Sequence, residues 1–268
     1  MRKIKSYIIL LVFNLLAAPA IMAQSKTVTL DYFFNNEYRK NSAGALERYH
    51  YTWEDQRSSG YSIWGEVFKK NGASLKSLET EPTVQSLSAT DIYIIVDPDT
   101  KKETANPNYI ETRHIKAITD WVKRGGVLVL MANDSANAEL PHLNKLAEKF
   151  GIHFNDDLYK HVIGTQFEMG AITVSANDPV FKTAKKIYLK DIATLKLSSP
   201  ATPLLTDSTR VIIGTAKYGT GTVMAVGDPW LYNEYTNGRL PAVMGFDNDK
   251  AADDVTKWLL SKIPAKIK

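Results

Sequence analysis

Two short apolar runs with one predicted helix between them most constrain what this chain can fold into. The runs are Asp91–Val96 (DIYIIV) and Val127–Met131 (VLVLM), and the helix is predicted over Tyr109–Arg124, where Gly125-Gly126 ends it. Strands that are apolar at every position are typical of a parallel sheet with both faces covered. The pattern therefore predicts an α/β fold, a three-layer sandwich with a mostly parallel central sheet.

Further segments extend this pattern along the chain. The other predicted strands and helices of the alternating part are Val28–Phe34, Gly60–Lys70, Ala73–Leu78, Pro141–Phe150 and Asp249–Leu260. The second half differs, because His153–Leu197 is predicted to contain short strands and Val211–Ala216 is predicted to form a hairpin with Thr222–Val226. We therefore expect antiparallel additions to the sheet there. No internal repeat or linker is found, which predicts a single domain over residues 24–268.

The first 23 residues have the features of a secretory signal. Arg2, Lys3 and Lys5 precede the apolar run Tyr7–Ala18, and Ala20–Ala23 offers a small-residue cleavage site. The apolar run is too short for a membrane span. We therefore expect export to the periplasm, with no insertion into the membrane after the signal is removed.

Composition excludes several classes of function. The formal charge of +4 falls by the three signal charges to +1, which argues against a nucleic-acid-binding surface. The chain has no cysteine, so disulfides, thiolate metal sites and a cysteine nucleophile are excluded. The five histidines are scattered, without HExxH or EF-hand spacing. No metal or other cofactor is expected.

A long aromatic segment follows the first predicted strand. Glu47–Arg57 combines three aromatic residues with His50, two arginines and three acids, and it has neither helical nor strand periodicity. The loop is expected to begin near Asn35 and to exceed 20 residues. Loops of that length are usually functional or disordered, and disordered segments are poor in aromatic residues. Rings beside charged groups suit a sugar ligand. The alternative is a loop that fills the core with Tyr51 and Trp53.

Three apolar strands end in similar polar signatures. Asp97 and Asp99 follow the first, Asn133 and Asp134 follow the second, and Asp228 follows the third. Ligands of open α/β sheets bind outside the carboxyl ends of the strands, so these side chains predict a functional edge. Each acid alone also suits a helix cap or a turn. Their carboxylates are, in addition, possible ligands of a hard cation.

Five runs of the sequence are similar to one known family, and they are Tyr51–Asp55, Gly60–Gly65, Tyr93–Thr100, Gly125–Met131 and Val226–Tyr235. The chain resembles the glutamine-amidotransferase-like domain that is often attached to unsaturated rhamnogalacturonyl hydrolases. The resemblance implies a class I glutamine-amidotransferase-like, flavodoxin-like fold. Amidotransferase chemistry is not implied, because the chain has no cysteine to follow a central strand.

The hydrolase module is absent, and the chain is similar to the free-standing oligosaccharide dehydratases of ulvan-degrading systems. The resemblance implies removal of water from the non-reducing-end glucuronate of an ulvan-type oligosaccharide. The product is a 4,5-unsaturated uronate, which unsaturated glucuronyl hydrolases accept in the next step. The hydrogen on C5 and the oxygen on C4 lie on the same sugar face, so a metal-independent syn elimination by a carbon–oxygen lyase is expected.

Residue type and position at the sheet edge suggest individual roles. We assign catalytic roles to His50, Tyr232 and Asp134. The predicted substrate-binding residues are Arg48, Trp53, Arg57, Asp99, Asn133, Glu168, Asp228 and Trp230. Among them Trp53 and Trp230 would stack on the sugar. The alternative function is a non-catalytic oligosaccharide-binding accessory protein of a polysaccharide-degradation system, since aromatic loops serve binding as well as catalysis. A hydrolase or lyase of another carbohydrate bond is the third.

Overall fold

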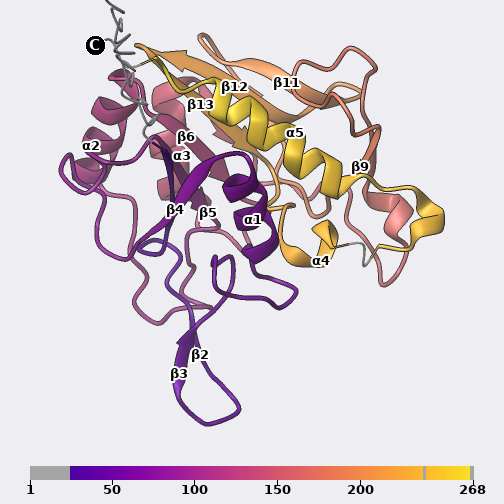
Figure 1. Cartoon of the computed structure of the whole chain (residues 1–268), viewed down its shortest axis with the longest axis horizontal. Helices are drawn as coiled ribbons and strands as arrows, with labels where there is room; N and C mark the ends of the chain where they lie inside the picture. Colours follow the sequence, from indigo (N-terminus) through magenta and orange to yellow (C-terminus); the bar gives the residue numbers. More distant parts are fainter. Residues whose placement is uncertain (1–24, 238–239, 266–268) are drawn as a thin grey trace, which may run out of the picture.

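A mixed nine-stranded sheet with helices on both faces forms the centre of the computed structural model, which describes residues 25–237 and 240–265 (Figure 1). The predicted signal, residues 1–23, lies outside the described residues. The expected mixed α/β fold, with a large and mostly parallel central sheet between helices, is confirmed. No helix in the described part of the chain has the length and apolar character needed to cross a membrane.

Five parallel strands make up one side of the sheet. In spatial order they are β4 (Ala73–Leu78), β1 (Lys26–Asp31), β5 (Ile92–Val96), β6 (Val127–Met131) and β13 (Gly221–Val226). An antiparallel extension follows on β13 and consists of β12 (Arg210–Tyr218), β11 (Thr202–Asp207), β10 (Leu195–Leu197) and β7 (Ile152–Phe154). The antiparallel additions expected in the second half are thereby confirmed.

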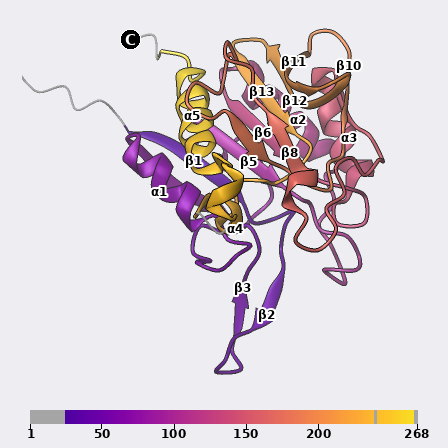
Figure 2. The same cartoon turned by 90° about the vertical axis from the view of Figure 1, so that its right-hand side faces the viewer.

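The buried side chains separate into two clusters, one on each face of the sheet. Helices α1 (Ser62–Lys70) and α5 (Asn248–Ser261) contribute to the first cluster, and α2 (Thr112–Lys123) and α3 (Leu140–Ala147) contribute to the second. Successive strand side chains point to opposite faces, so every position of β5 is buried. This double burial explains why β5 and β6 have no charged residue, and Figure 2 shows α1 and α5 on one side of the sheet and α2 and α3 on the other.

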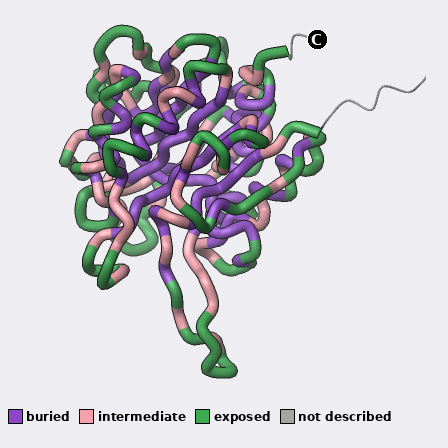
Figure 3. Tube along the Cα trace, turned by 90° about the vertical axis from the view of Figure 1, so that its left-hand side faces the viewer, coloured by how far each residue is buried: buried purple, intermediate pink, exposed green. Residues whose placement is uncertain are grey.

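A narrow hairpin projects from the body. Its strands are β2 (Tyr38–Lys40) and β3 (Leu46–Arg48), and Figures 1 and 3 show the hairpin extending away from the sheet with an exposed tip. The hairpin interrupts the segment that the sequence predicts as one long loop. Strand β1 ends at Asp31, earlier than predicted, where the Asp31 carboxyl accepts backbone hydrogen bonds from Phe33 and Phe34.

Smaller elements complete the described chain. They are the pair β8 (Ala171–Thr173) and β9 (Lys186–Tyr188), the short helix α4 (Asn233–Thr236), and the 3-10 segments η1 (Glu148–Phe150), η2 (Phe167–Gly170) and η3 (Ala242–Met244). Helix α4 follows β13 and contacts both α1 and α5. It therefore lies close to the loop that precedes α1.

Candidate functional site

The carboxyl ends of β5, β6 and β13 bring three polar side chains to one edge of the sheet. Asp97 follows β5, and its Oδ1 accepts a hydrogen bond from the backbone N–H of Asn133, which follows β6, at 3.1 Å. Asp228 follows β13, and its Oδ2 accepts from the backbone N–H of Lys190 at 2.8 Å. The three strands are neighbours in parallel register, so these residues form one cluster.

Four buried oxygen atoms at this edge have no hydrogen-bond partner among the described residues. They are Asp97 Oδ2, Asp99 Oδ1, Asn133 Oδ1 and Asp228 Oδ1. A buried polar group without a partner costs about 1–3 kcal/mol, and native proteins tolerate few of them. Four at one strand-end edge indicate a place built to bind a polar ligand.

Burial also changes the protonation of this edge. It raises the pKa of Asp97 to about 8 and the pKa of Asp228 to about 8, and it raises the pKa of Asp99 to about 6. The Tyr51 side chain and the Asn133 backbone oppose the effect at Asp97 without cancelling it. Asp97 and Asp228 are therefore largely protonated at neutral pH and can donate hydrogen bonds.

Three tyrosines surround the two acids. Tyr51 lies beside Asp97, and its ring centroid is 5.6 Å from that of Tyr61 and 6.0 Å from that of Tyr232. Burial and the neighbouring charges of Asp97 or Asp228 raise the pKa of each phenol well above its usual range. The phenols stay protonated, and the Tyr61 hydroxyl donates to the Pro229 carbonyl at 3.0 Å.

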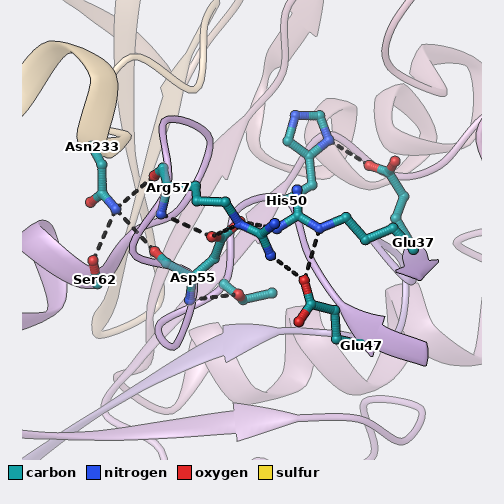
Figure 4. Close-up of polar contacts among 9 residues, drawn as sticks. Glu37, Glu47, His50, Asp55, Arg57, Ser62 and Asn233 are labelled. Carbon is teal, nitrogen blue, oxygen red and sulfur yellow. Dashed lines mark hydrogen bonds and ion pairs between the residues drawn. The ribbon is translucent and has the colours of Figure 1, made fainter. Parts of the chain in front are cut away.

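His50 is a partly exposed titratable side chain at this edge. Its ring stacks between Tyr49 and Tyr51, with centroid distances of 5.6 and 4.1 Å, and its Nδ1 lies 2.5 Å from Glu37 Oε1 (Figure 4). Burial alone would lower the pKa of His50. The hydrogen bond to Glu37 and the negative charge of Glu37 are the largest opposing causes, and the pKa of His50 is raised. His50 and Tyr51 both have positive φ angles, a strain that functional sites often hold.

The two tryptophans predicted to stack on a sugar belong to the core, which corrects the prediction. Trp53 is 8% exposed, packs against Trp64 and Phe68, and donates its indole N–H to the Lys76 carbonyl at 3.0 Å. Trp230 has no exposed surface. Neither ring offers an open face to a ligand. For Tyr51 and Trp53, the alternative of a loop that fills the core is the one observed.

The predicted carboxylate-binding arginines are engaged elsewhere. Arg48 donates to the carbonyls of Tyr32 and Asn35 and to the Tyr38 hydroxyl. Arg57 pairs with Glu47 and Asp55, and Figure 4 shows these contacts at the base of the hairpin. Both guanidinium groups fix the hairpin to the body, so their assignment as ligands of a uronate is corrected to a structural role.

The other predicted residues are divided between the edge and its surroundings. Asp99 Oδ2 accepts from the Asn36 N–H at 3.0 Å, and Tyr232 lies beside Tyr51, so both belong to the edge. Asp134 accepts from the Ala136 N–H at 2.9 Å and from the Asn137 side chain, and thus holds its own turn. Glu168 is exposed and pairs with Lys186 on β9. Those contacts give Asp134 and Glu168 local structural roles.

Two buried residues of this region, Glu37 and Asn233, were not predicted from the sequence to have a role. Glu37 is 5% exposed and contacts His50, although nothing in its sequence neighbourhood separates it from a surface glutamate. Asn233 is also buried, and its side-chain amide joins the loop after β13 to the loop before α1. Its position in the run Trp230–Tyr235 was the available signal. Within residues 25–237 and 240–265, no group of three or more His, Asp or Glu is placed to hold a metal ion.

The fold and this edge define an α/β protein with a cluster of acids, tyrosines and one histidine at the carboxyl ends of its parallel strands. The chain belongs to the DUF4350 family, a domain of unknown function, whose model matches residues 54–239. No curated protein matches it significantly.

Solved structures share the fold at low sequence identity. The mmIFT52 N-terminal domain is 18% identical with a TM-score of 0.66, over 91% of this chain and 100% of that chain. The cytoplasmic protein STM1381 from Salmonella typhimurium LT2 is 14% identical with a TM-score of 0.58, over 89% and 100%. The cytoplasmic protein STM3548 from Salmonella typhimurium is 16% identical with a TM-score of 0.57, over 87% and 98%. These similarities concern the fold alone.

Proposed function

We propose that this protein is a carbon–oxygen lyase that removes water from the non-reducing-end glucuronate of an ulvan-type oligosaccharide. The observation that carries the proposal is the edge itself, where buried oxygens of Asp97, Asn133 and Asp228 have no hydrogen-bond partner among residues 25–237 and 240–265. The partly exposed His50 lies near Asp97 at this edge. A sugar acid presents several hydroxyls and a carboxylate, which suit such an edge. The class I glutamine-amidotransferase-like ancestry and export to the periplasm form part of the same proposal.

The chemistry requires a base near neutral pKa and donors for a carboxylate. In the proposed step, His50 removes the proton from C5, and the electron pair of that bond forms the C4=C5 double bond. The C4–O bond breaks, and the proton from His50 joins the departing hydroxide to give water. Negative charge develops on the substrate carboxylate during the step. Protonated Asp97 or Asp228 would stabilise it by donating a hydrogen bond in a buried site.

The residues that solvent reaches define the direction of approach. His50 and Asn133 are partly exposed, whereas Asp97 and Asp228 are buried together with Tyr51 and Tyr232. The sugar would therefore approach from the side of His50 and Asn133. In this arrangement Tyr232, the other predicted acid–base residue, supplies a hydroxyl from the inner side of the edge and acts as a hydrogen-bond donor.

The test is incubation of the purified protein with glucuronate-ended ulvan oligosaccharides. The proposal predicts products lighter by one water, with new ultraviolet absorbance from the conjugated double bond. Saturable binding without a change in mass would instead support a non-catalytic oligosaccharide-binding accessory protein. Shortened oligosaccharides would support a hydrolase or lyase of another carbohydrate bond. Either of these results would overturn the dehydratase proposal.

A further inference from the structure

We infer that Glu37 is a positioning residue that fixes the tautomer and orientation of His50, so that Nε2 is the nitrogen left to exchange a proton. The effect of Glu37 on catalysis rests on the proposed function, whereas its effect on the tautomer of His50 does not. Glu37 Oε1 lies 2.5 Å from His50 Nδ1, and the two residues are 13 positions apart in the sequence.

Burial and a backbone hydrogen bond restrict the position of Glu37. Glu37 is 5% exposed, and its backbone carbonyl accepts a hydrogen bond from the Tyr49 N–H at 3.3 Å. This backbone contact closes the base of the β2–β3 hairpin directly before His50. The Glu37 side chain therefore has little freedom next to the imidazole of His50, and Figure 4 shows the two groups facing each other.

The imidazole is restricted on both of its faces as well. The ring planes of Tyr49 and Tyr51 are inclined by 12° and 15° to that of His50, so the three rings form a stack. Because a carboxylate only accepts hydrogen bonds, Nδ1 must carry the shared proton. With the faces covered and Nδ1 occupied, Nε2 is the ring nitrogen left for a ligand.

Several charged or titratable groups face this ring, and their contributions differ. Glu37 and Glu103 carry charges that favour the imidazolium form, and Asp97 adds to them once it ionises near pH 8. Of these acids, Glu37 is the one that hydrogen-bonds to the ring. The Tyr49 hydroxyl also interacts with Glu37. The guanidinium carbon of Arg39 lies 4.5 Å from the centroid of the Tyr49 ring. Removal of the Glu37 charge should therefore act on His50 more strongly than removal of the Glu103 charge.

The decisive experiment is nuclear magnetic resonance of the wild-type chain with ¹⁵N-labelled histidine, followed by Glu37→Gln. In the wild type, the neutral form of His50 is expected to carry its proton on Nδ1. In Glu37→Gln, we expect a lower pKa of His50 and a mixture of the two tautomers. The acid limb of the pH profile of kcat/KM should move in the same direction, and Glu37→Asp should partly restore the wild-type values.

A matched pair elsewhere in the fold gives the control. His153 Nδ1 lies 2.9 Å from Glu148 Oε1 in an exposed position on β7, so Glu148→Gln should affect His153 and leave the His50 signals unchanged. A wild-type His50 protonated on Nε2 when neutral would overturn the inference, even if the variant failed to fold. Unchanged His50 signals in a folded Glu37→Gln variant would also overturn it. The nuclear magnetic resonance measurements do not depend on substrate turnover, so failure of the proposed function would be seen separately, in the kcat/KM assay.

Discussion

The side-chain amide of Asn233 donates a hydrogen bond to the backbone carbonyl of Asp55 at 3.0 Å, and it thereby joins α4 to the loop that carries His50 (Figure 4). The same nitrogen contacts the Arg57 carbonyl and the Ser62 hydroxyl, both at 2.9 Å. Asn233 Oδ1 accepts from the backbone N–H of Ile63, at the start of α1. One buried side chain thus holds the aromatic loop against the sheet edge.

Asn233→Ala should destabilise the fold by about 2–4 kcal/mol, because it leaves the buried carbonyl of Asp55 without its partner and removes several hydrogen bonds at once. Urea unfolding measures the change, and hydrogen exchange should show faster opening of residues 51–60. Gln85→Ala removes an exposed amide and should stay within about 0.5 kcal/mol of the wild type. Equal effects of the two variants would contradict the account.

His50→Gln should lower kcat for the elimination by roughly 10²–10⁴-fold, since a positioned acid–base group contributes a factor of that size. The glutamine keeps a side-chain amide near Glu37 but cannot exchange the proton. His153→Gln changes the other glutamate-paired histidine, far along the chain on β7, and should leave kcat unaltered. Full activity of a correctly folded His50→Gln variant would exclude His50 as the base.

Asp228→Asn should be increasingly more stable than the wild type as the pH rises from 4 to 8. Burial raises the pKa of Asp228 from 3.8 to about 8 in the folded state. Between these values the unfolded chain releases the proton and the folded chain keeps it, so the wild type loses stability from about pH 4 to pH 8. The variant escapes that loss, so its free energy of unfolding should rise relative to the wild type by up to ~1.4 kcal/mol for each pH unit across this window. Urea unfolding at pH 4, 6 and 8 measures the trend, and a pH-independent difference would contradict it.

Trp53→Ala should cost about 3–5 kcal/mol of folding free energy, the usual loss for a large aromatic side chain in a core. The ring packs among Tyr61, Trp64 and Phe68, so the deletion leaves a cavity between the loop and α1. Trp258→Ala, on the partly exposed side of α5, should cost clearly less. If Trp53→Ala reduced sugar binding at unchanged stability, the stacking role would return.

The central elements were predictable because their signals are local. β5 and β6 lack charged residues, and each follows a polar or glycine-containing boundary. β6 has the predicted bounds, and β5 begins one residue later than predicted, at Ile92. Parallel neighbours end at a common edge, and from this relationship the meeting of Asp97, Asn133 and Asp228 could be predicted as well. The positions of residues that follow directly from strand direction can therefore be predicted from the sequence.

The contacts inside the aromatic loop were not predictable in the same way. The strands of the β2–β3 hairpin have three residues each, too few for a periodic pattern, although they bring Glu37 to His50. The burial of Trp53 depends on Trp64 and Phe68 of α1, and therefore on how the loop packs in three dimensions. Arg57 meets Glu47 only because the hairpin returns to its own base.

The most direct test of the central claim is a crystal structure of the protein with a saturated glucuronate-ended oligosaccharide, with Asp97→Asn as a slow variant if the wild type turns the ligand over. The account predicts that the acidic sugar binds at the carboxyl ends of β5, β6 and β13, in contact with His50 and Asn133. A cavity lined by Trp121, Gly125 and Pro264 lies at the opposite, amino-terminal ends of these strands. Sugar bound there, with the edge beside His50 unoccupied, would contradict the account.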